Sequence, residues 1–389
     1  MPAAPLQLLA LTSRELGDLA AAEIEVAGGR VLAIRPASVA FTGDLDCAYR
    51  VCLWSRVASR VLLPLVRFPA PDYAAVYRAA REVDWSLHLP RGSTLAVDCR
   101  LRRAALSHSH FAALRVKDAV VDRLREVRGE RPTIDLARPS VRLSLYVERR
   151  QGVLAVDLSG EPLHRRGYRR QGIAAPLKET LAAAILLRAG WPAAAAAGQP
   201  LVDPLCGSGT LPIEGALIAA DVAPGLRREH WGFLGWGRHR HERWLAVRQD
   251  AEMRCRRGLA GRLPPILGSD GDAAAVAVAQ ANAAAAGVAG IVGFERRSIA
   301  EAAPPAGSPP GLVVANPPYG RRLGGAGLPA LWAELGRCLK QRFPGWRVAV
   351  LSADPELSAR LGLRAHRKNV LYNGALRCQL AHYRVAEKP

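Results

Sequence analysis

The alternation of apolar and polar positions over the first 176 residues predicts short strands mixed with amphipathic helices. Residues 140–149 and 153–160 have the pattern of a hairpin, and residues 108–127 carry the apolar stripe of a helix. Residues 47–61 predict another helix, which runs into a strand over 62–68. This mixture predicts an α+β half.

A different pattern begins at residue 177, where short, continuously apolar strands alternate with helices. The predicted helices cover residues 211–221, 273–286 and 328–341. A long insertion occupies 222–262, and a terminal hairpin is expected near 369–385. Apolar strands that alternate with helices are typical of a parallel sheet covered on both faces. The fold class is therefore α/β, with a doubly wound, mainly parallel C-terminal sheet.

Charge indicates the kind of partner. The chain has 389 residues, half of them hydrophobic, so it is large enough for several cores. It carries 54 Lys and Arg against 34 Asp and Glu, a net charge of +20. This balance disfavours cationic ligands and points to a polyanion such as nucleic acid, the alternative being a merely solvated basic surface.

The cysteines and the N-terminus indicate the compartment. Seven Cys include no C-x-x-C pair and no zinc-type spacing with His, so we expect reduced thiols and no metal. The first apolar run lacks a cationic start and breaks at Arg14 and Glu15, so we expect neither a signal peptide nor a membrane span. A cytoplasmic protein is the expectation.

Two strand ends suggest a cofactor site. The segment DPLCGSGT from Asp203 lies between an apolar strand and a helix, where glycines let a ligand approach the backbone. Pro212 replaces the third Gly of a dinucleotide fingerprint, which disfavours a nicotinamide cofactor. Asp270 ends the next strand, and its carboxylate suits a ribose diol. The alternative is a structural turn with an Asp cap.

The tetrapeptide NPPY, Asn316 to Tyr319, follows another apolar strand and is the most specific motif in the chain. An exocyclic base amine is a poor nucleophile because its lone pair is delocalised into the ring. The Asn316 side-chain oxygen and the Pro317 carbonyl can accept its protons and expose the lone pair. The ring of Tyr319 can stack on an extruded base, for which the hydroxyl is not needed. The alternative is a proline-stiffened turn.

In this order DPLCGSGT, GSD and NPPY resemble the class I S-adenosylmethionine-dependent amino-methyltransferases. Further segments, among them LTSRELGDLAAAEI, VDLSGEPLHRRGYR and APLKETLAAAILLRAGW, resemble the THUMP-domain 23S ribosomal RNA guanine-N2 methyltransferases over nearly the whole chain. The resemblance implies a ferredoxin-like unit, a THUMP RNA-binding domain, a basic linker and a methyltransferase domain. Their expected bounds are 1–45, 46–159, 160–176 and 177–389.

The resemblance also implies site residues. The methionine part of S-adenosylmethionine would be held by the loop of Asp203, Cys206, Gly207 and Gly209, and its ribose by Asp270. The family usually has an Asp at the third strand end, where this chain has Ser298, so the adenine contact weakens or passes to the backbone. Asn316, Pro317 and Tyr319 would hold the target base. Some members carry a second methyltransferase domain, whose chemistry is not expected in these residues.

The expected RNA contacts are basic side chains in three places. They are Arg100, Arg102, Arg103, Arg115 and Lys117 around helix 108–127, Arg165, Arg166 and Arg169 in the linker, and Arg321 and Arg322 beyond the base site. Solvated surface is the alternative for each group. In the insertion, we expect its Trp residues to pack, some of its Arg to contact RNA, and His239 and His241 not to bind metal.

The resulting prediction is a monomeric cytoplasmic enzyme that methylates guanine N2 in large-subunit ribosomal RNA, naked or partly assembled, without a metal. Guanine N2 lies in the minor groove of paired RNA, so the nucleotide must flip out of its stack. Two alternatives stay open. One is a transfer RNA guanine-N2 or an adenine-N6 methyltransferase, and the other is an RNA-binding ribosome-assembly factor whose methylation is incidental.

Overall fold

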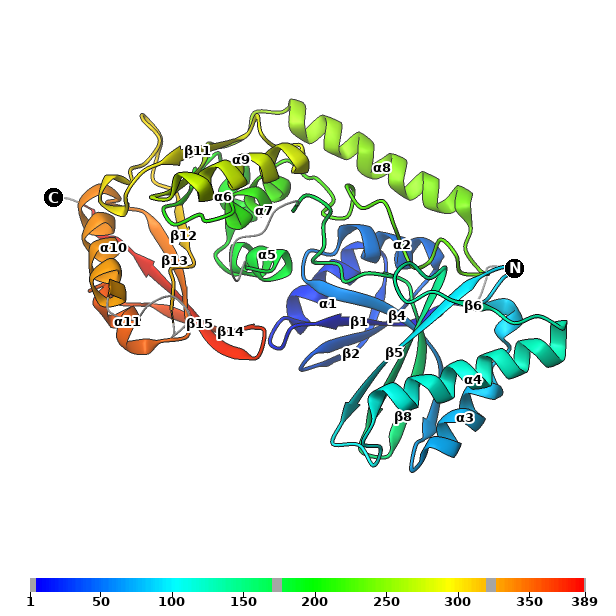
Figure 1. The fold of residues 1–389 in the computed structure, drawn as a ribbon. Helices are drawn as coiled ribbons and strands as arrows, with labels where there is room; N and C mark the ends of the chain where they lie inside the picture. Colours follow the sequence, from blue (N-terminus) through cyan, green and yellow to red (C-terminus); the bar gives the residue numbers. More distant parts are fainter. Residues whose placement is uncertain (1–4, 170–176, 320–326, 388–389) are drawn as a thin grey trace.

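The computed structural model describes residues 5–169, 177–319 and 327–387, which form two sheets with α5 and α7 between them (Figure 1). One sheet belongs to the N-terminal half and has eight strands, in the order β2-β3-β1-β4-β8-β7-β5-β6. The other belongs to the C-terminal half and has seven strands, in the order β11-β10-β9-β12-β13-β15-β14. The predicted fold class is confirmed.

The first unit of the N-terminal sheet is a ferredoxin-like β-α-β-β-α-β arrangement. Its elements are β1 (Leu6–Thr12), α1 (Gly17–Val26), β2 (Arg30–Arg35), β3 (Ser38–Gly43), α2 (Leu45–Trp54) and β4 (Ala58–Pro69). Strand β4 pairs with β1 on one side and with β8 on the other, so the first and second units share one sheet. Helix α2 packs with α1, β3 and β4, which places it in the first unit although the expected boundary lay at residue 45.

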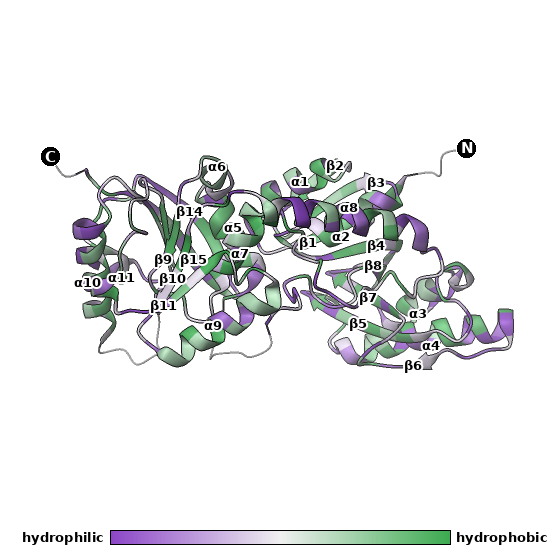
Figure 2. Cartoon of the chain, turned by 90° about the horizontal axis from the view of Figure 1, so that it is seen from above, coloured by the Kyte–Doolittle hydropathy of each residue, from purple (hydrophilic) through white to green (hydrophobic). Residues whose placement is uncertain are grey.

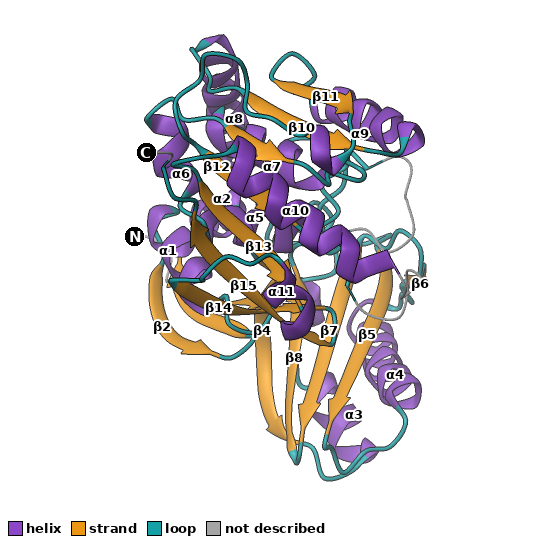
Figure 3. Cartoon of the chain, turned by 90° about the vertical axis from the view of Figure 1, so that its left-hand side faces the viewer, coloured by secondary structure: helices purple, strands orange, loops and turns teal. Residues whose placement is uncertain are grey.

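The second unit continues the sheet and covers one face with two helices (Figure 3). Its elements are α3 (Tyr73–Arg81), η1 (Trp85–Leu87), β5 (Thr94–Arg102), α4 (Ser109–Arg128), β6 (Thr133–Ile134), β7 (Val141–Glu148) and β8 (Gln151–Asp157). The β7–β8 hairpin and the helix over 108–127 are confirmed, and the helix ends at Gly129 in a left-handed conformation.

The C-terminal half has four parallel strand pairings and an antiparallel edge made by the terminal hairpin. Its strands are β9 (Leu201–Asp203), β10 (Ile266–Asp270), β11 (Val292–Arg296), β12 (Leu312–Ala315), β13 (Arg347–Ser352), β14 (Arg367–Asn373) and β15 (Leu376–Arg384). Its helices are α5 (Glu179–Arg188), α6 (Trp191–Ala196), α7 (Thr210–Ala219), α8 (His241–Ala260), α9 (Ala273–Ala286), η2 (Ile299–Glu301), α10 (Leu328–Arg342) and α11 (Pro355–Arg360).

Two hydrophobic cores lie on opposite faces of the C-terminal sheet. One is closed by α10 and α11 and includes Trp332 and Phe343. The other, against α5, α7 and α9, continues without a break into the core of the N-terminal half. Apolar residues accordingly concentrate on the inner strands and helices, and polar residues on the outer sides of α4 and α10 (Figure 2). None of the described helices is both long enough and apolar enough to cross a membrane.

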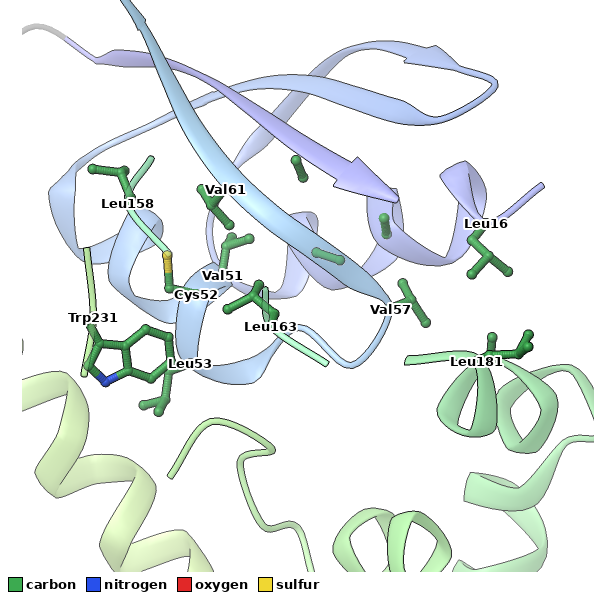
Figure 4. Packing of buried hydrophobic residues seen from close by; sticks show 14 of the residues in the cluster. Leu16, Val51, Cys52, Leu53, Val57, Val61, Leu158, Leu163, Leu181 and Trp231 are labelled. Carbon is green, nitrogen blue, oxygen red and sulfur yellow. The ribbon is translucent and has the colours of Figure 1, made fainter. Parts of the chain in front are cut away.

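The continuous core crosses the junction between the two halves. Leu53 and Val57 of the first unit pack in one cluster with Leu163 of the linker, Leu181 of α5 and Trp231 of the insertion (Figure 4). All five side chains are buried. The two halves therefore form one body and are not separate domains on a flexible tether.

A buried charge cluster lies at the same junction. Glu214 of α7 is fully buried, accepts a hydrogen bond from the Tyr168 hydroxyl at 3.1 Å and lies 3.6 Å from the Arg166 guanidinium. Arg166 also donates to the carbonyls of Ser55 and Leu163, and Arg56 donates to the carbonyls of Leu217 and Val222. Burial raises the pKa of Glu214, and the two guanidinium groups oppose that shift. The cluster thus ties the linker, the first unit and α7 together.

Two sequence expectations differ from the structure. The helix expected over 47–61 stops at Trp54, because Glu23 accepts hydrogen bonds from the Ser55 hydroxyl and the Arg56 backbone N–H and holds these residues in an extended turn. The insertion at 222–262 contains the 20-residue helix α8, which its mixed composition did not reveal.

We predict that Glu214→Ala lowers the free energy of unfolding by about 3–5 kcal/mol, because it leaves Arg166 buried without its carboxylate partner. Urea unfolding followed by circular dichroism measures the change. Glu161→Ala is the matched control, since Glu161 pairs with Arg165 on the surface, and it should cost less than about 1 kcal/mol. Equal losses in the two variants would contradict this role of the junction cluster.

Candidate active site

The strand order of the C-terminal sheet creates a crevice above β9. The chain runs from β9 outward to β10 and β11, and then crosses to β12 on the other side of β9. Open α/β sheets bind ligands at the carboxyl ends of the strands where the order reverses in this way. Register places Asp203 beside Gly268, and Leu312 beside Leu201. Asp270 and Asn316 therefore end the strands on either side of Asp203.

The loop after β9 is fixed by its neighbours. The Cys206 N–H donates to the Ser269 carbonyl at 2.9 Å, and the Gly207 N–H donates to Asp270 Oδ2 at 3.0 Å. Gly209 has φ +80°, and a Cβ atom there would lie 2.8 Å from the ring of Phe294. Glycine is therefore required at this position.

The two carboxylates of the crevice have different environments. Asp203 is 1% exposed, and burial raises its pKa to about 8, which the Leu205 N–H bond opposes and the charge of Asp270 reinforces. No described Lys or Arg offsets this charge. Asp270 is partly exposed and accepts one backbone N–H on each oxygen, so each oxygen has a lone pair left for a hydroxyl. These two acidic side chains fit a ligand with cationic groups and a diol, as S-adenosylmethionine has.

Asn316 has the most unusual environment in the crevice. Its Oδ1 is buried and finds no hydrogen-bond partner within the three described segments. An unsatisfied buried acceptor costs about 1–3 kcal/mol. The adjacent backbone is held in place, because the Trp332 indole N–H donates to the Pro318 carbonyl at 3.1 Å. The loop after β12 is therefore anchored two residues beyond Asn316, and the Asn316 acceptor has no partner in the part of the chain that the structure describes.

Tyr319 lies over the hairpin of β14 and β15. Its hydroxyl accepts a hydrogen bond from the Asn373 Nδ2 at 3.0 Å and contacts the Cys378 Sγ at 3.8 Å. Burial raises the pKa of Tyr319 well above its usual range. Asn373 was not among the expected site residues, because it lies 54 residues from Tyr319 on a strand with no recognisable motif. The turn-forming Asn-Gly pair was the only available signal.

Ser298 is the least suited of the expected cofactor residues. Its hydroxyl donates to Glu301 at 2.7 Å and its backbone N–H to the same carboxylate at 3.0 Å, which completes the capping box of η2. The hydroxyl is thus already engaged. An adenine contact at this strand end would use the backbone near Ser298.

The basic residues around α4 are only partly available. Arg102 pairs with Glu148, while Arg115 and Lys117 both lie near Asp118. Arg100 and Arg103 are exposed and form no ion pair within the described residues. These five residues surround α4 and the end of β5, which lie on the side of the N-terminal half away from the C-terminal sheet (Figure 1).

The linker arginines have roles that the sequence did not predict. Arg166 is 2% exposed and belongs to the junction cluster, so it has no surface to offer to a phosphate. Arg169 binds Glu179 at 2.8 Å and donates to the hydroxyls of Ser208 and Thr210 beside the cofactor loop. Arg165 is exposed. Arg321 and Arg322 lie outside the described residues.

The aromatic residues of the insertion pack inward, as predicted. Trp231, Trp236 and Trp244 are each less than 5% exposed. The hydroxyl of Tyr49 and the Nδ1 of His239 share a hydrogen bond at 2.7 Å, which fixes the insertion to α2. No group of side chains in the described segments has the composition of a metal site.

Comparison with family models gives three matches. The model described as "RMKL-like, methyltransferase domain" matches residues 166–382, the THUMP domain matches 70–157, and the "RlmL ferredoxin-like domain" matches 7–62. These matches coincide with the C-terminal half, the second unit and the first unit. They extend the ferredoxin-like unit into β4, in agreement with the packing of α2.

Curated relatives are similar along almost the whole chain. "Ribosomal RNA large subunit methyltransferase K/L" of Syntrophotalea carbinolica is 50% identical over 388 residues, which is 99% of this chain and 54% of that protein. The protein of the same name from Methylococcus capsulatus is 47% identical over 97% of this chain and 51% of its own length. The chain thus spans about half the length of the curated relatives it matches.

Solved structures show the same fold. A "predicted N6-adenine-specific DNA methylase" from Listeria monocytogenes is 32% identical, with a TM-score of 0.85 over 98% of this chain and 96% of that one. SMU.472, described as a putative methyltransferase complexed with SAH, is 26% identical, with a TM-score of 0.87 over 99% of both chains.

The crevice, the glycine loop and the strand order together define a class I S-adenosylmethionine-dependent methyltransferase, and the cofactor of this class is S-adenosylmethionine. Within that class, the chain belongs to the RMKL-like methyltransferase family, with a THUMP domain and an RlmL-type ferredoxin-like domain before the catalytic domain.

We predict that S-adenosylmethionine binding releases a proton from Asp203 near pH 7. The pKa of Asp203 is about 8 in the free protein, and a cationic ligand beside it favours the ionised form. Affinity should therefore rise between pH 6 and 8. Calorimetry in two buffers of different ionisation enthalpy measures the released proton. Asp203→Asn is the control, because protons that S-adenosylmethionine itself gains or loses are the same for both proteins, whereas the variant has no carboxyl group at position 203 to release one. Equal proton release in the two proteins would contradict the prediction.

Proposed function

We propose that this protein transfers the methyl group of S-adenosylmethionine to the exocyclic N2 amine of a guanosine in large-subunit ribosomal RNA, giving N2-methylguanosine. The observation that carries the proposal is the buried Oδ1 of Asn316, which has no hydrogen-bond partner among residues 5–169, 177–319 and 327–387. The bound cofactor supplies a methyl group activated by its sulfonium. The chain's own residues must bring an amine to it with the nitrogen lone pair exposed.

The geometry around Asn316 supports an amine as the acceptor. An exocyclic amine has two N–H donors, and the two acceptors for them would be Asn316 Oδ1 and the backbone carbonyl of the next residue, Pro317. Hydrogen bonds to both protons would favour a tetrahedral nitrogen with its lone pair exposed. This lone pair would accept the methyl group of the bound cofactor, which leaves as S-adenosylhomocysteine, and the methylated nitrogen would lose one proton to solvent. Because Trp332 anchors the loop at the Pro318 carbonyl, positioning and fixed dipoles would supply the catalytic effect without a metal.

RNA as the substrate is supported by the N-terminal half. The chain carries a net charge of +20 and has a THUMP domain joined rigidly to the catalytic sheet. The curated relatives are named as large-subunit ribosomal RNA methyltransferases. A flipped guanosine costs least to extrude from an incompletely formed helix, so we propose that naked or partly assembled RNA is modified in the cytoplasm, by a monomer.

A second candidate is methylation of adenine N6. The Listeria structure with 32% identity is described as a predicted N6-adenine-specific DNA methylase. An NPPY loop accepts any exocyclic amine, so the loop chemistry alone suits both bases. The two candidates differ in the nucleoside formed and in the nucleic acid used.

The test is to incubate the purified protein with methyl-labelled S-adenosylmethionine and deproteinised 23S ribosomal RNA, transfer RNA or DNA, and to identify the labelled nucleoside by mass spectrometry. We expect N2-methylguanosine in 23S RNA. Asn316→Ala should lower kcat by about 10²–10³-fold without changing cofactor affinity. Labelled N6-methyladenosine, or label found only in transfer RNA, would contradict the proposal and support one of its alternatives. Full activity of Asn316→Ala would contradict the role proposed for the Asn316 side chain.

A separate prediction concerns Tyr319. Stacking needs only its ring, but the structure adds the hydrogen bond to Asn373, whose net worth is about 0.5–1.5 kcal/mol. Tyr319→Phe and Asn373→Ala should therefore each lower kcat by about 2–10-fold, and the double variant should lose no more than either one. Tyr319→Ala should lower kcat far more, because it removes the ring on which the base would stack.

The control for Asn373→Ala is Asn369→Ala. Asn369 lies on the same strand but shares its hydrogen bond with His382, so its loss should leave kcat unchanged. If Tyr319→Phe were as inactive as Tyr319→Ala, the hydroxyl would have a chemical role and the stacking account would be wrong.

A further inference from the structure

A basic cleft of about 970 Å³ lies where the two halves meet. Its walls come from the loop before β7, the linker, the start of α5 and the beginning of the insertion. We call it the junction cleft. Its volume is at the upper end of the range of ligand pockets in proteins, so it can hold more than one nucleotide-sized group.

The lining of the junction cleft is strongly cationic. Eight Arg and Lys residues line it against three Glu. Several of these cations are already engaged, Arg169 with Glu179 and Arg165 with Glu161. The exposed side chains of Arg138, Lys178 and Arg227 form no ion pair within the described residues. These three are therefore available to an anion from outside.

The floor of the cleft is built before any ligand arrives. Arg228 is 8% exposed and donates to the carbonyls of Ser159, Glu161, Pro162 and Arg165, at distances between 2.7 and 3.1 Å. Its guanidinium also lies 4.7 Å from the ring centre of Trp231. Such a network fixes the linker backbone, so little conformational entropy is lost when a ligand binds.

The cleft reaches the cofactor loop. Arg169 lines the cleft and donates to the hydroxyls of Ser208 and Thr210, which belong to the loop and helix after β9. Lys178 immediately precedes α5, which packs against α7. The guanidinium of Arg169 thus links the cleft to the cofactor loop, and a polyanion in the cleft would lie one side chain away from that loop.

We propose that the junction cleft holds the phosphate backbone of the RNA strand that carries the target base, with Arg138, Lys178 and Arg227 as its phosphate contacts. The inference rests on the proposed function and names where its substrate lies. The sequence predicted the main RNA contacts around α4, but Arg102, Arg115 and Lys117 there have carboxylate neighbours. The main RNA surface is therefore proposed to be the junction cleft.

The test compares three triple variants of the full chain. Arg138→Ala, Lys178→Ala and Arg227→Ala remove the cleft contacts. Arg103→Ala, Arg115→Ala and Lys117→Ala remove the same number of Arg and Lys from the α4 surface. The third variant removes three Arg and Lys side chains from α10 and α11, at the outer side of the C-terminal half (Figure 1), by the substitutions Arg337→Ala, Lys340→Ala and Arg360→Ala. Each is titrated with deproteinised 23S ribosomal RNA between 50 and 300 mM KCl.

For the cleft variant, we expect RNA binding to weaken at least about tenfold at low salt and the slope of log Kd against log salt to flatten by about two, as three lost single-strand phosphate contacts require. Affinity for S-adenosylmethionine should stay unchanged, which also shows that the variant is folded. The two comparison variants should lose much less RNA affinity.

Unchanged RNA affinity and slope in the cleft variant would overturn the proposal. So would equal losses in the α10 variant, because net charge would then explain binding, or a larger loss in the α4 variant. Binding is measured without methyl transfer, so the result is independent of which nucleoside the wild-type protein forms.

Discussion

The rest of the structure depends on the buried pairing of Arg166 with Glu214. This pair joins the linker to α7, the helix that begins directly after the cofactor loop. Breaking such a pair leaves an uncompensated charge in a low-dielectric interior, which is far more costly than separating a surface pair. The pair therefore fixes the distance between the N-terminal sheet and the crevice. The RNA that we propose as substrate, lying between the two halves, would therefore meet the crevice at a set position.

The crevice concentrates groups that are unfavourable in the free protein. Asp203 is a buried carboxyl group whose pKa burial raises to about 8, with no cation beside it among the described residues. Asn316 has a buried acceptor that finds no donor in the same part of the chain. Both lie at strand ends on the same edge of the sheet, where the backbone cannot relax around them. The stability lost there is consistent with a site shaped for a cationic cofactor and an amine, because these ligands satisfy the two groups.

The sequence predicted the parts of the site that depend on local rules. Asp203, Asp270 and Asn316 each follow a short apolar strand, and parallel strands bring their carboxyl ends to one edge. Long-range contacts were not predictable in this way. Asn373 reaches Tyr319 from a distant hairpin, Glu23 ends α2 early, and Arg166 is buried because Glu214 lies opposite it. Helix α8 was missed because its exposed faces carry charges that hide a helical stripe.

The most direct test of the account is a crystal structure with S-adenosylhomocysteine and an oligoribonucleotide that contains an unpaired guanosine. The account predicts that guanine N2 lies about 2.9 Å from Asn316 Oδ1 and faces the sulfur of the cofactor product, with the base against Tyr319. A guanine bound elsewhere, or an Asn316 Oδ1 that accepts from a protein donor while the base is bound, would contradict it.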